Sequence, residues 1–215
     1  KLLINCVSDA APAHVQRRLM AILQTATSRE VFVSNGLEAF NACAGKIAQH
    51  ALLRRLQLPA PRSVVVTQAT GECLAARAAM EKLRYPLLLK PNAGGFGHGI
   101  LNFDSAEELR QASVQELKRV SFGEDGLALL QERHTPRDGH VGRIWMLDGK
   151  VLCAVLAPVM EVGKEGPSGC MADGRAALAA KAWEPPTGLQ EAAARIVLAA
   201  KANWGSIEVI NPDEI

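Results

Sequence analysis

Hydrophobic residues recur first at strand spacing and then at helix spacing in the first 58 residues. The segment KLLINCV is apolar enough for a strand, HVQRRLMAILQ repeats its apolar residues with a helical period, and VFV at 31–33 predicts a second strand. A further helix is predicted over residues 41–58, where Ile47, Leu52 and Leu56 share one face and Pro59 ends the run. This part of the chain is therefore expected to fold as strand, helix, strand, helix.

From residue 63 to residue 131, strand and helix patterns alternate. SVVVT predicts a strand, residues 71–84 a helix, and LLLK and ILNF two strands on either side of a glycine-rich loop. Ser105 and Glu108 form a capping-box pattern that predicts a helix running to about residue 119. LALLQ at 127–131 predicts the next strand, and the alternation as a whole indicates the α/β (α+β) fold class.

The last third of the chain begins with a predicted hairpin. RIWML and KVLCAVLA are joined by Asp148 and Gly149, a strong turn signal between two antiparallel strands. Residues 161–186 are rich in glycine, proline and polar residues and are expected to be a loop. Thr187 and Gln190 then suggest a second capping box opening a helix, and SIEVI predicts the final strand.

Composition narrows the classes of partner. The chain has 215 residues, 48% of them hydrophobic, which is enough for one or two globular domains. Its formal net charge of +2 indicates neither nucleic acid nor a membrane surface as a partner, and no apolar run approaches the roughly 18 residues that cross a bilayer. The five cysteines are odd in number and lack a CxxC pair, which disfavours a disulfide framework and favours a reducing, cytoplasmic compartment.

The stretch LLLKPNAGGFGHGI carries the candidate chemistry. A dinucleotide-binding loop opens a helix, whereas ILNF predicts a strand, and a Walker A loop ends in Gly-Lys-Ser/Thr, whereas Lys90 precedes the glycines here. The remaining reading is a glycine hairpin that folds over the phosphates of ATP with Lys90 at its base. Backbone amides can approach phosphate oxygens closely at Gly94, Gly95, Gly97 and Gly99. The glycines alone fit a flexible surface hairpin equally well.

Four segments, in order, resemble the ATP-grasp proteins, most closely the RimK-like carboxylate–amine ligases. They are NACAGKIAQHALLRRLQLPAPRSVVV, YPLLLKPNAGGFGHGI, LALLQERHTPRDGHVGRIWMLDGKVLCAV and LQEAAARIVLAAKANWGSIEVI. The resemblance implies an ATP-grasp fold in which two α/β subdomains clamp the nucleotide. Residues 1–35 would end a preceding α/β domain, 36–130 would form the linker helix and central (lid) subdomain, and 131–215 the C-terminal subdomain, incomplete at its C-terminal end.

The resemblance also implies which residues hold the nucleotide. Lys46 and Lys90 would contact its phosphates from opposite sides of the cleft, and Gln131 and Glu132 would form the hinge whose backbone reads the adenine edge. Without the resemblance, Lys46 is more simply an exposed helix lysine and Glu132 a solvated strand end. The assignment of both therefore depends on the family.

Two further residues are implied in the reaction itself. Arg143 matches an arginine that contacts the transferring phosphate, a task suited to a permanently charged planar group, and Glu208 matches the first magnesium carboxylate. Each would otherwise read as a surface residue of a strand. The pattern departs at Val141, which stands where the family has an acidic residue, and KVLCAVLAP lacks the expected second arginine. The second acidic residue and the asparagine of the magnesium site are not found up to residue 215.

The implied activity is ATP- and Mg2+-dependent ligation. A small-molecule or peptide carboxylate would attack the γ-phosphate to form an acyl-phosphate and ADP, and an amine would then attack that intermediate. A carboxylate–thiol ligase or a carboxylase on the same fold remains an alternative, as does a non-catalytic ATP-binding sensing or interaction module. The oligomeric state is left open, a homo-oligomer included.

Overall fold

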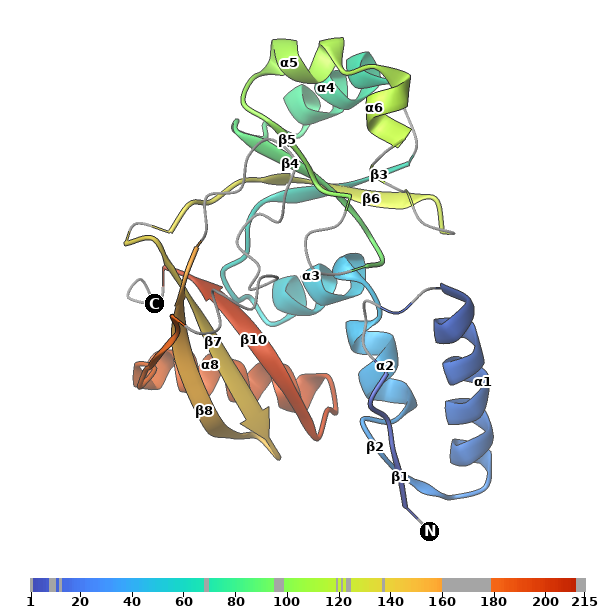
Figure 1. Ribbon diagram of the computed structural model, residues 1–215. Coiled ribbons are helices and arrows are strands. Elements are labelled where there is room, and N and C mark those ends of the chain that lie inside the picture. The colour runs from blue at the N-terminus through green and yellow to red at the C-terminus, as the bar shows by residue number, and fades with distance from the viewer. Residues whose placement is uncertain are drawn as a thin grey trace.

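The computed structural model describes residues 2–7, 11, 13–67, 70–94, 99–118, 120, 122, 125–136, 138–159 and 179–211. Within these ranges the chain forms a small two-stranded sheet and two four-stranded sheets, one of the larger ones covered on one face by three helices and the other by α8 (Thr187–Ala199) (Figure 1). Gly95, Gly97 and most of the predicted loop at 161–186 lie outside the described residues.

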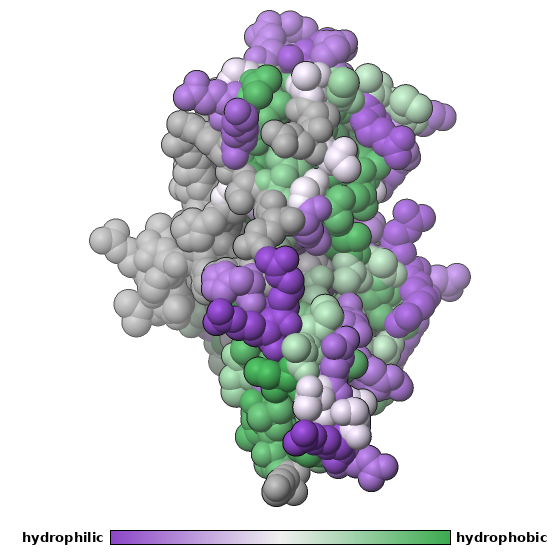
Figure 2. Space-filling model, turned by 90° about the vertical axis from the view of Figure 1, so that its right-hand side faces the viewer, coloured by the Kyte–Doolittle hydropathy of each residue, from purple (hydrophilic) through white to green (hydrophobic). Residues whose placement is uncertain are grey.

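The N-terminal unit consists of strand β1 (Leu2–Ile4), helix α1 (Ala13–Ser28) and strand β2 (Phe32–Ser34), as the hydrophobic pattern predicted. The two strands pair in parallel, with α1 as the crossover between them. Hydrophobic surface gathers toward the lower end of the face shown in Figure 2, over this unit. Its large exposed apolar side chains include Leu2, Ile4, Ile22 and Phe32.

The single helix predicted over residues 41–58 was wrong, because two helices occupy this region. Helix α2 (Leu37–Cys43) and helix α3 (Lys46–Arg55) are separated at Gly45, which has a φ of +93°. A side chain fits poorly there, since an ideal Cβ on Gly45 would lie 2.7 Å from Asn92 Oδ1. The break therefore coincides with a contact between Gly45 and the distant residue Asn92, which the local apolar pattern does not predict.

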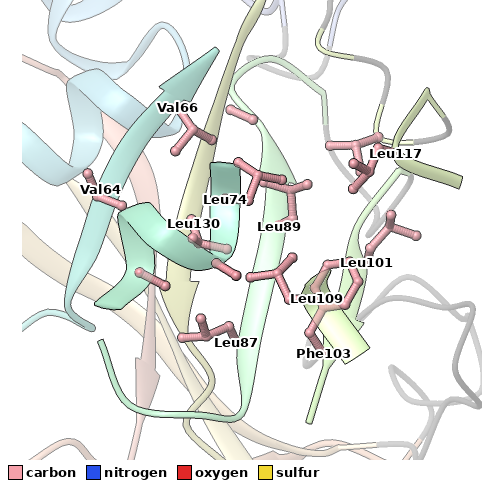
Figure 3. Packing of buried hydrophobic residues seen from close by; sticks show 14 of the residues in the cluster. Val64, Val66, Leu74, Leu87, Leu89, Leu101, Phe103, Leu109, Leu117 and Leu130 are labelled. Carbon is pink, nitrogen blue, oxygen red and sulfur yellow. The ribbon is translucent and has the colours of Figure 1, made fainter. Parts of the chain in front are cut away.

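The upper subdomain contains one sheet and three helices. Its elements are β3 (Ser63–Thr67), α4 (Gly71–Met80), β4 (Leu87–Pro91), β5 (Leu101–Phe103), α5 (Ala106–Gln111), α6 (Val114–Lys118) and β6 (Leu127–Glu132). The strand order is β3-β6-β4-β5, and all neighbours are antiparallel. The helices cover one face of the sheet, where the main core lies (Figure 3).

Strand alternation divides the upper sheet into two chemically different faces. Leu87, Leu89 and Leu130 point toward the helices and are fully buried (Figure 3). Successive side chains of a strand point to opposite faces, so Lys90 and Gln131 lie on the other face. The side chain of Lys90, predicted to contact the nucleotide phosphates, therefore lies on the face of the sheet turned away from the core.

The capping box predicted at Ser105 is confirmed in part. Ser105 Oγ accepts a hydrogen bond from Glu108 N at 3.2 Å, and the Glu108 carboxylate accepts one from Asp104 N, just before the cap residue, at 2.7 Å. The predicted continuous helix to residue 119 is not formed, because α5 ends at Gln111 and α6 starts at Val114.

Among the residues that the structure describes, the lower subdomain pairs one sheet with one helix. Its elements are β7 (His140–Leu147), β8 (Lys150–Pro158), β9 (Lys181–Ala182), α8 (Thr187–Ala199) and β10 (Trp204–Ile210). The strand order is β10-β7-β8-β9, again antiparallel throughout. The predicted hairpin is confirmed, with positive φ at both Asp148 and Gly149, as a tight hairpin turn requires.

Helix α8 packs its apolar face on the lower sheet and begins at Thr187, but the capping box predicted from Thr187 and Gln190 is not formed. Pro186 occupies the cap position, and no side-chain cap hydrogen bond is formed. The side chain of Gln190 instead donates to Pro185 O at 2.7 Å. Proline fixes the backbone at the helix entrance, so a capping box from Thr187 is not needed there. No helix within the described ranges is long and apolar enough to span a membrane.

An amide pair joins the N-terminal unit to the lower subdomain. Asn35 N donates to Asn203 Oδ1 at 2.9 Å, and Asn203 N donates to Asn35 Oδ1 at 2.8 Å. Asn35 Nδ2 also donates to Trp204 O at 2.9 Å. The Asn35 side chain therefore bonds backbone groups at the start of β10, while the Asn35 backbone N–H, just after β2, bonds the Asn203 side chain.

Candidate nucleotide-binding site

Lys90 lies at the base of the glycine loop, held by a row of polar side chains across three strands. Its Nζ donates to Gln131 Oε1 at 2.7 Å, and Gln131 Nε2 donates to Ser63 Oγ at 2.8 Å. The three residues come from β4, β6 and β3 and share the sheet face turned away from α4. This row fixes the ammonium group beside the point where the loop leaves the sheet.

Lys46 reaches the same loop from a different part of the chain. It is the first residue of α3, and its Nζ donates to Gly94 O at 2.7 Å. Gly94 has a φ of +108° and nothing within 4 Å of an ideal Cβ, so its conformation, not crowding, favours glycine. Gly99, at the other end of the loop, also has a positive φ of 71°. Lys46 therefore contacts the start of the loop, while Lys90 lies on the strand that leads into it and contacts Gln131.

The two predicted hinge residues point to opposite sides of the sheet. Gln131 faces Lys90, whereas Glu132 is only 3% exposed and its carboxylate accepts hydrogen bonds from Arg84 N at 2.9 Å and Arg84 Nη2 at 3.3 Å. Glu132 N donates to Arg62 O at 2.9 Å. The Glu132 carboxylate thus ties together the segments around the hinge, and its predicted role toward adenine stays a prediction about the backbone.

The charges around Glu132 keep it ionised. Burial by itself raises the pKa of its carboxyl, but the hydrogen bonds from Arg84 and the charges of Arg84 and Arg62 outweigh that effect, so the pKa lies below its usual value. Arg62 Nη1 is 3.9 Å from the carboxylate, and His134 Nε2 is 4.0 Å from it.

Arg143 and Glu208 are brought side by side in the lower sheet. They are directly opposed in the register of β7 and β10, and Arg143 Nη2 donates to Glu208 Oε1. The guanidinium also lies over the Trp145 ring, 5.8 Å from its centre. Because the alternate residue Ile144 is buried against α8, this pair lies on the face turned away from that helix. The pair joins two predicted residues that are 65 positions apart.

The Glu208 carboxylate fits the donor chemistry of magnesium. Its side chain is 42% exposed, and Mg2+ is usually bound by one or two carboxylates together with substrate phosphates and water. In the part of the chain that the structure describes, no three His, Cys, Asp or Glu side chains gather into a metal-binding group. The described residues therefore supply one carboxylate ligand rather than a closed metal site.

Two cavities lie beside this arrangement but are not lined by the predicted site residues. One, of about 360 Å³, lies between α3 and the start of β3 and is lined in part by His50, Arg54 and Ser63. Burial, and then the charge of Arg54, lower the pKa of His50. The other, of about 220 Å³, lies between α1, α2 and the loop base, where Arg17 and Asp125 contribute to its wall.

Sequence reasoning missed Asn92, a residue at the base of the loop whose side chain forms two hydrogen bonds to distant segments. Its Oδ1 accepts from Ile47 N at 3.0 Å, and its Nδ2 donates to Asp125 Oδ2 at 2.6 Å. Ser63, which completes the row from Lys90, was also missed. The partners of Asn92 are 45 and 33 positions away, so no local spacing in the sequence signals these contacts.

The architecture is that of the ATP-grasp fold, and comparison with solved structures supports this. The chain aligns with the ATP-grasp ligase PsnB complexed with minimal precursor at a TM-score of 0.59 and 21% identity, covering 91% of this chain and 57% of PsnB. D-cycloserine synthetase DcsG gives 0.67 at 16% identity, covering 91% and 66% of the two chains. A RimK domain ATP-grasp protein from Sphaerobacter thermophilus gives 0.64 at 18% identity, covering 97% and 67%. The fold predicted from the four segments is confirmed.

Sequence comparison finds two curated proteins that match part of the chain. The chain is 27% identical to a biotin carboxylase of Halalkalibacterium halodurans, over 68% of this chain and 41% of that protein. It is 32% identical to a urea amidolyase of Lachancea kluyveri, over 55% of this chain and 6% of that protein. No family model matches the sequence. The chain spans less than half of either curated relative, so their activities are not transferred to it here.

Proposed function

We propose that this chain binds ATP and Mg2+ and forms the nucleotide-binding part of a carboxylate–amine ligase. One arrangement supports the proposal: Lys46 from α3 contacts the glycine loop, with its Nζ 2.7 Å from Gly94 O, and Lys90 lies on β4, the strand that leads into the same loop. Two ammonium groups and the backbone amides of a glycine loop form a typical cradle for a polyphosphate. The ATP-grasp fold and its ligase neighbours support the same reading.

The lysines and the loop have a binding role in this proposal. Lys46 and Lys90 donate to phosphate oxygens, and the amides of Gly94, Gly95, Gly97 and Gly99 add neutral donors. A hydrogen bond to a charged group contributes roughly 1.5–3 kcal/mol, so the loss of any one of these donors should weaken ATP binding measurably. Gln131 holds Lys90 toward the loop, and the hinge backbone at Gln131 and Glu132 contacts the adenine edge.

The proposed reaction has two steps. A carboxylate oxygen attacks the γ-phosphorus of ATP, the bond from that phosphorus to the bridging oxygen breaks, and ADP leaves with the electron pair. An amine nitrogen then attacks the acyl carbon, phosphate leaves, and the nitrogen loses a proton to give an amide. A thiol acceptor would follow the same course to a thioester. Arg143 stabilises the negative charge on the transferring phosphate, a role that depends on placement of charge rather than on bond chemistry.

Glu208 is proposed as the magnesium ligand and as the group that orients Arg143. Bound Mg2+ neutralises phosphate charge in such sites. The ion pair with Glu208 and the stacking on Trp145 hold the guanidinium at the open face of the lower sheet. The Arg143 side chain is 22% exposed, so water screens its charge only in part. A preorganised arginine of this kind costs little reorganisation at the moment of transfer.

ATP affinity of Lys90→Met tests the phosphate assignment. Loss of one charged hydrogen bond is expected to raise the Kd for ATP by about 10- to 100-fold in isothermal titration calorimetry. Lys118→Met, at an exposed position of α6, is the matched control and is expected to bind ATP as the unchanged protein does. Wild-type affinity in Lys90→Met would contradict the assignment of the loop as a phosphate site.

Trapping of the acyl-phosphate tests ligation against simple nucleotide binding. The protein is incubated with ATP, Mg2+, a panel of carboxylic and amino acids and hydroxylamine, which converts acyl-phosphates to hydroxamates. Hydroxamate and ADP are expected in equal amounts for the correct acid, and Arg143→Gln is expected to bind ATP but form neither. If the protein binds ATP yet releases no ADP with any acid, the ligase proposal fails and a non-catalytic sensing module becomes the better account.

A further inference from the structure

We propose that Asn92 is a positioning residue that sets the separation of the two phosphate lysines by capping α3 from the glycine loop. The proposal rests on the nucleotide-binding function above. Asn92 is the second residue after Lys90, and its backbone O accepts from Lys46 N at 3.0 Å. It therefore contacts the segment that carries each lysine.

The hydrogen bonds of Asn92 account for all of its backbone and side-chain polar groups. Besides the bond from Lys46 N, Asn92 N donates to Leu127 O at 3.1 Å, which ties it to β6. Its Oδ1 accepts from Ile47 N at 3.0 Å, and its Nδ2 donates to Asp125 Oδ2 at 2.6 Å. Asp125 thereby orients the amide so that its oxygen points at α3.

Helix α3 lacks a cap of its own. Its cap residue is Gly45, which has no side chain to accept from the first free N–H groups of the helix. Asn92 supplies the missing acceptors at Lys46 N and Ile47 N from a distant segment. Gly45 is buried and allows this approach, because an ideal Cβ there would lie 2.7 Å from the Asn92 amide oxygen.

This cap links the two halves of the proposed phosphate site. If Asn92 loses its side chain, the N-terminus of α3 is free to shift, and Lys46 moves relative to Lys90. Binding of the β- and γ-phosphates should suffer, because both ammonium groups serve them. A ligand without those phosphates should be affected much less. Asn92 acts through Lys46 and contacts no nucleotide in this account.

Nucleotide titrations of Asn92→Ala test the proposal. The Kd for ATP is expected to rise about 5- to 10-fold, as for loss of a helix cap, while the Kd for AMP stays within about twofold of the unchanged protein. Asn41→Ala, at an exposed position of α2, is the matched control and is expected to leave both values unchanged. Equal losses for ATP and AMP would indicate a purely structural role and overturn the proposal.

Two substitutions of Asp125 separate its hydrogen bond from its charge. Asp125→Ala and Asp125→Asn both remove the negative charge, but only asparagine keeps an oxygen that can accept from Asn92 Nδ2. Weaker ATP binding is expected for Asp125→Ala than for Asp125→Asn. Identical affinities of the two variants would contradict the orienting role of Asp125 and with it the proposed cap.

A measurement without nucleotide distinguishes this proposal from the function it rests on. Amide hydrogen exchange of Ile47 is expected to be at least about tenfold faster in Asn92→Ala than in the unchanged protein, because the cap bond is lost. Unchanged protection of Ile47 would refute the cap even if ATP binds. Faster exchange in a protein that binds no ATP would instead refute the phosphate-site function, and the positioning role would fall with it.

Discussion

Replacing Glu132 with glutamine is expected to lower the free energy of unfolding at pH 7 by about 1.5–3 kcal/mol. The Glu132 side chain is buried, and it receives two hydrogen bonds from Arg84, one from the backbone N–H and one from the guanidinium. Glutamine keeps an acceptor for the N–H but loses the charged bond to the guanidinium. The side chains of Arg62 and Arg84 are 54% and 78% exposed, so the longer-range charge attraction is largely screened and adds little.

Alanine at the same position is expected to cost more, about 3–5 kcal/mol. It removes both acceptors and leaves Arg84 N–H without its partner. The glutamine and alanine variants together separate the charged bond from the backbone bond. Glu191→Gln, on the exposed side of α8, is the control that changes charge without changing a buried contact, and it is expected to fall within 0.5 kcal/mol or so of the unchanged protein.

The stabilisation from Glu132 is also expected to depend on pH. The pKa of the folded-state carboxyl lies below its ordinary value of 4.5, so the stabilisation is fully present above that value and is lost as the pH falls through the folded-state pKa. The difference in stability between the protein and Glu132→Gln should therefore shrink from pH 7 toward pH 3.5.

Urea denaturation measures both effects when two signals are followed. The three tryptophans are Trp145, Trp183 and Trp204, so fluorescence reports on the lower subdomain, while far-ultraviolet circular dichroism reports on all helices and strands. The variant is expected to shift the dichroism transition at least as much as the fluorescence transition. Equal stability of Glu132→Gln and the unchanged protein at pH 7, or a gap that does not narrow at low pH, would refute the reasoning.

Two further predictions concern packing. Gly71→Ala is expected to destabilise the protein by roughly 2 kcal/mol or more, because an ideal Cβ would lie 2.2 Å from the backbone atom Leu109 O and 2.8 Å from the backbone atom Arg110 O. Gly188 also lies in a first helical turn but has nothing within 4 Å of an ideal Cβ, so Gly188→Ala should stabilise the protein by about 0.4–1 kcal/mol. Thermal denaturation compares the two variants. Similar melting temperatures for both would contradict this. Asn35→Ala should speed amide exchange in β1 and β2 by loosening the contact with Asn203, whereas Asn41→Ala should not, and equal exchange in the two variants would show that the amide pair is dispensable.

Strong local patterns led to correct elements, and contacts between distant segments caused the errors. SVVVT, LLLK and the hairpin at Asp148 and Gly149 were predicted correctly because strand alternation and turn chemistry are local properties. The helix predicted over 41–58 is interrupted at Gly45 by a contact with Asn92. The capping box at Thr187 failed because the preceding proline already fixes the backbone.

The candidate site shows the same division. Lys46, Lys90, Arg143 and Glu208 were named from motif resemblance, and the structure brings Lys46 to the loop, pairs Lys90 with Gln131 and joins the arginine to the glutamate. Their roles toward ATP and Mg2+ stay predictions. No local pattern indicates Asn92 or Ser63, because their roles depend on hydrogen bonds to residues 33 to 68 positions away.

By itself, the sequence determined the order of most strands and helices, the glycine loop with its lysine, and the resemblance to ATP-grasp proteins, because these depend on residue types at short spacing. Only the tertiary structure decided that Glu132 faces away from Lys90, that Asn92 caps α3 and that Arg143 opposes Glu208. These facts depend on strand register and on which helix end meets which loop. Strand register and the packing of helices on sheets are set by the burial of whole sheet and helix faces, and a single short motif does not specify them.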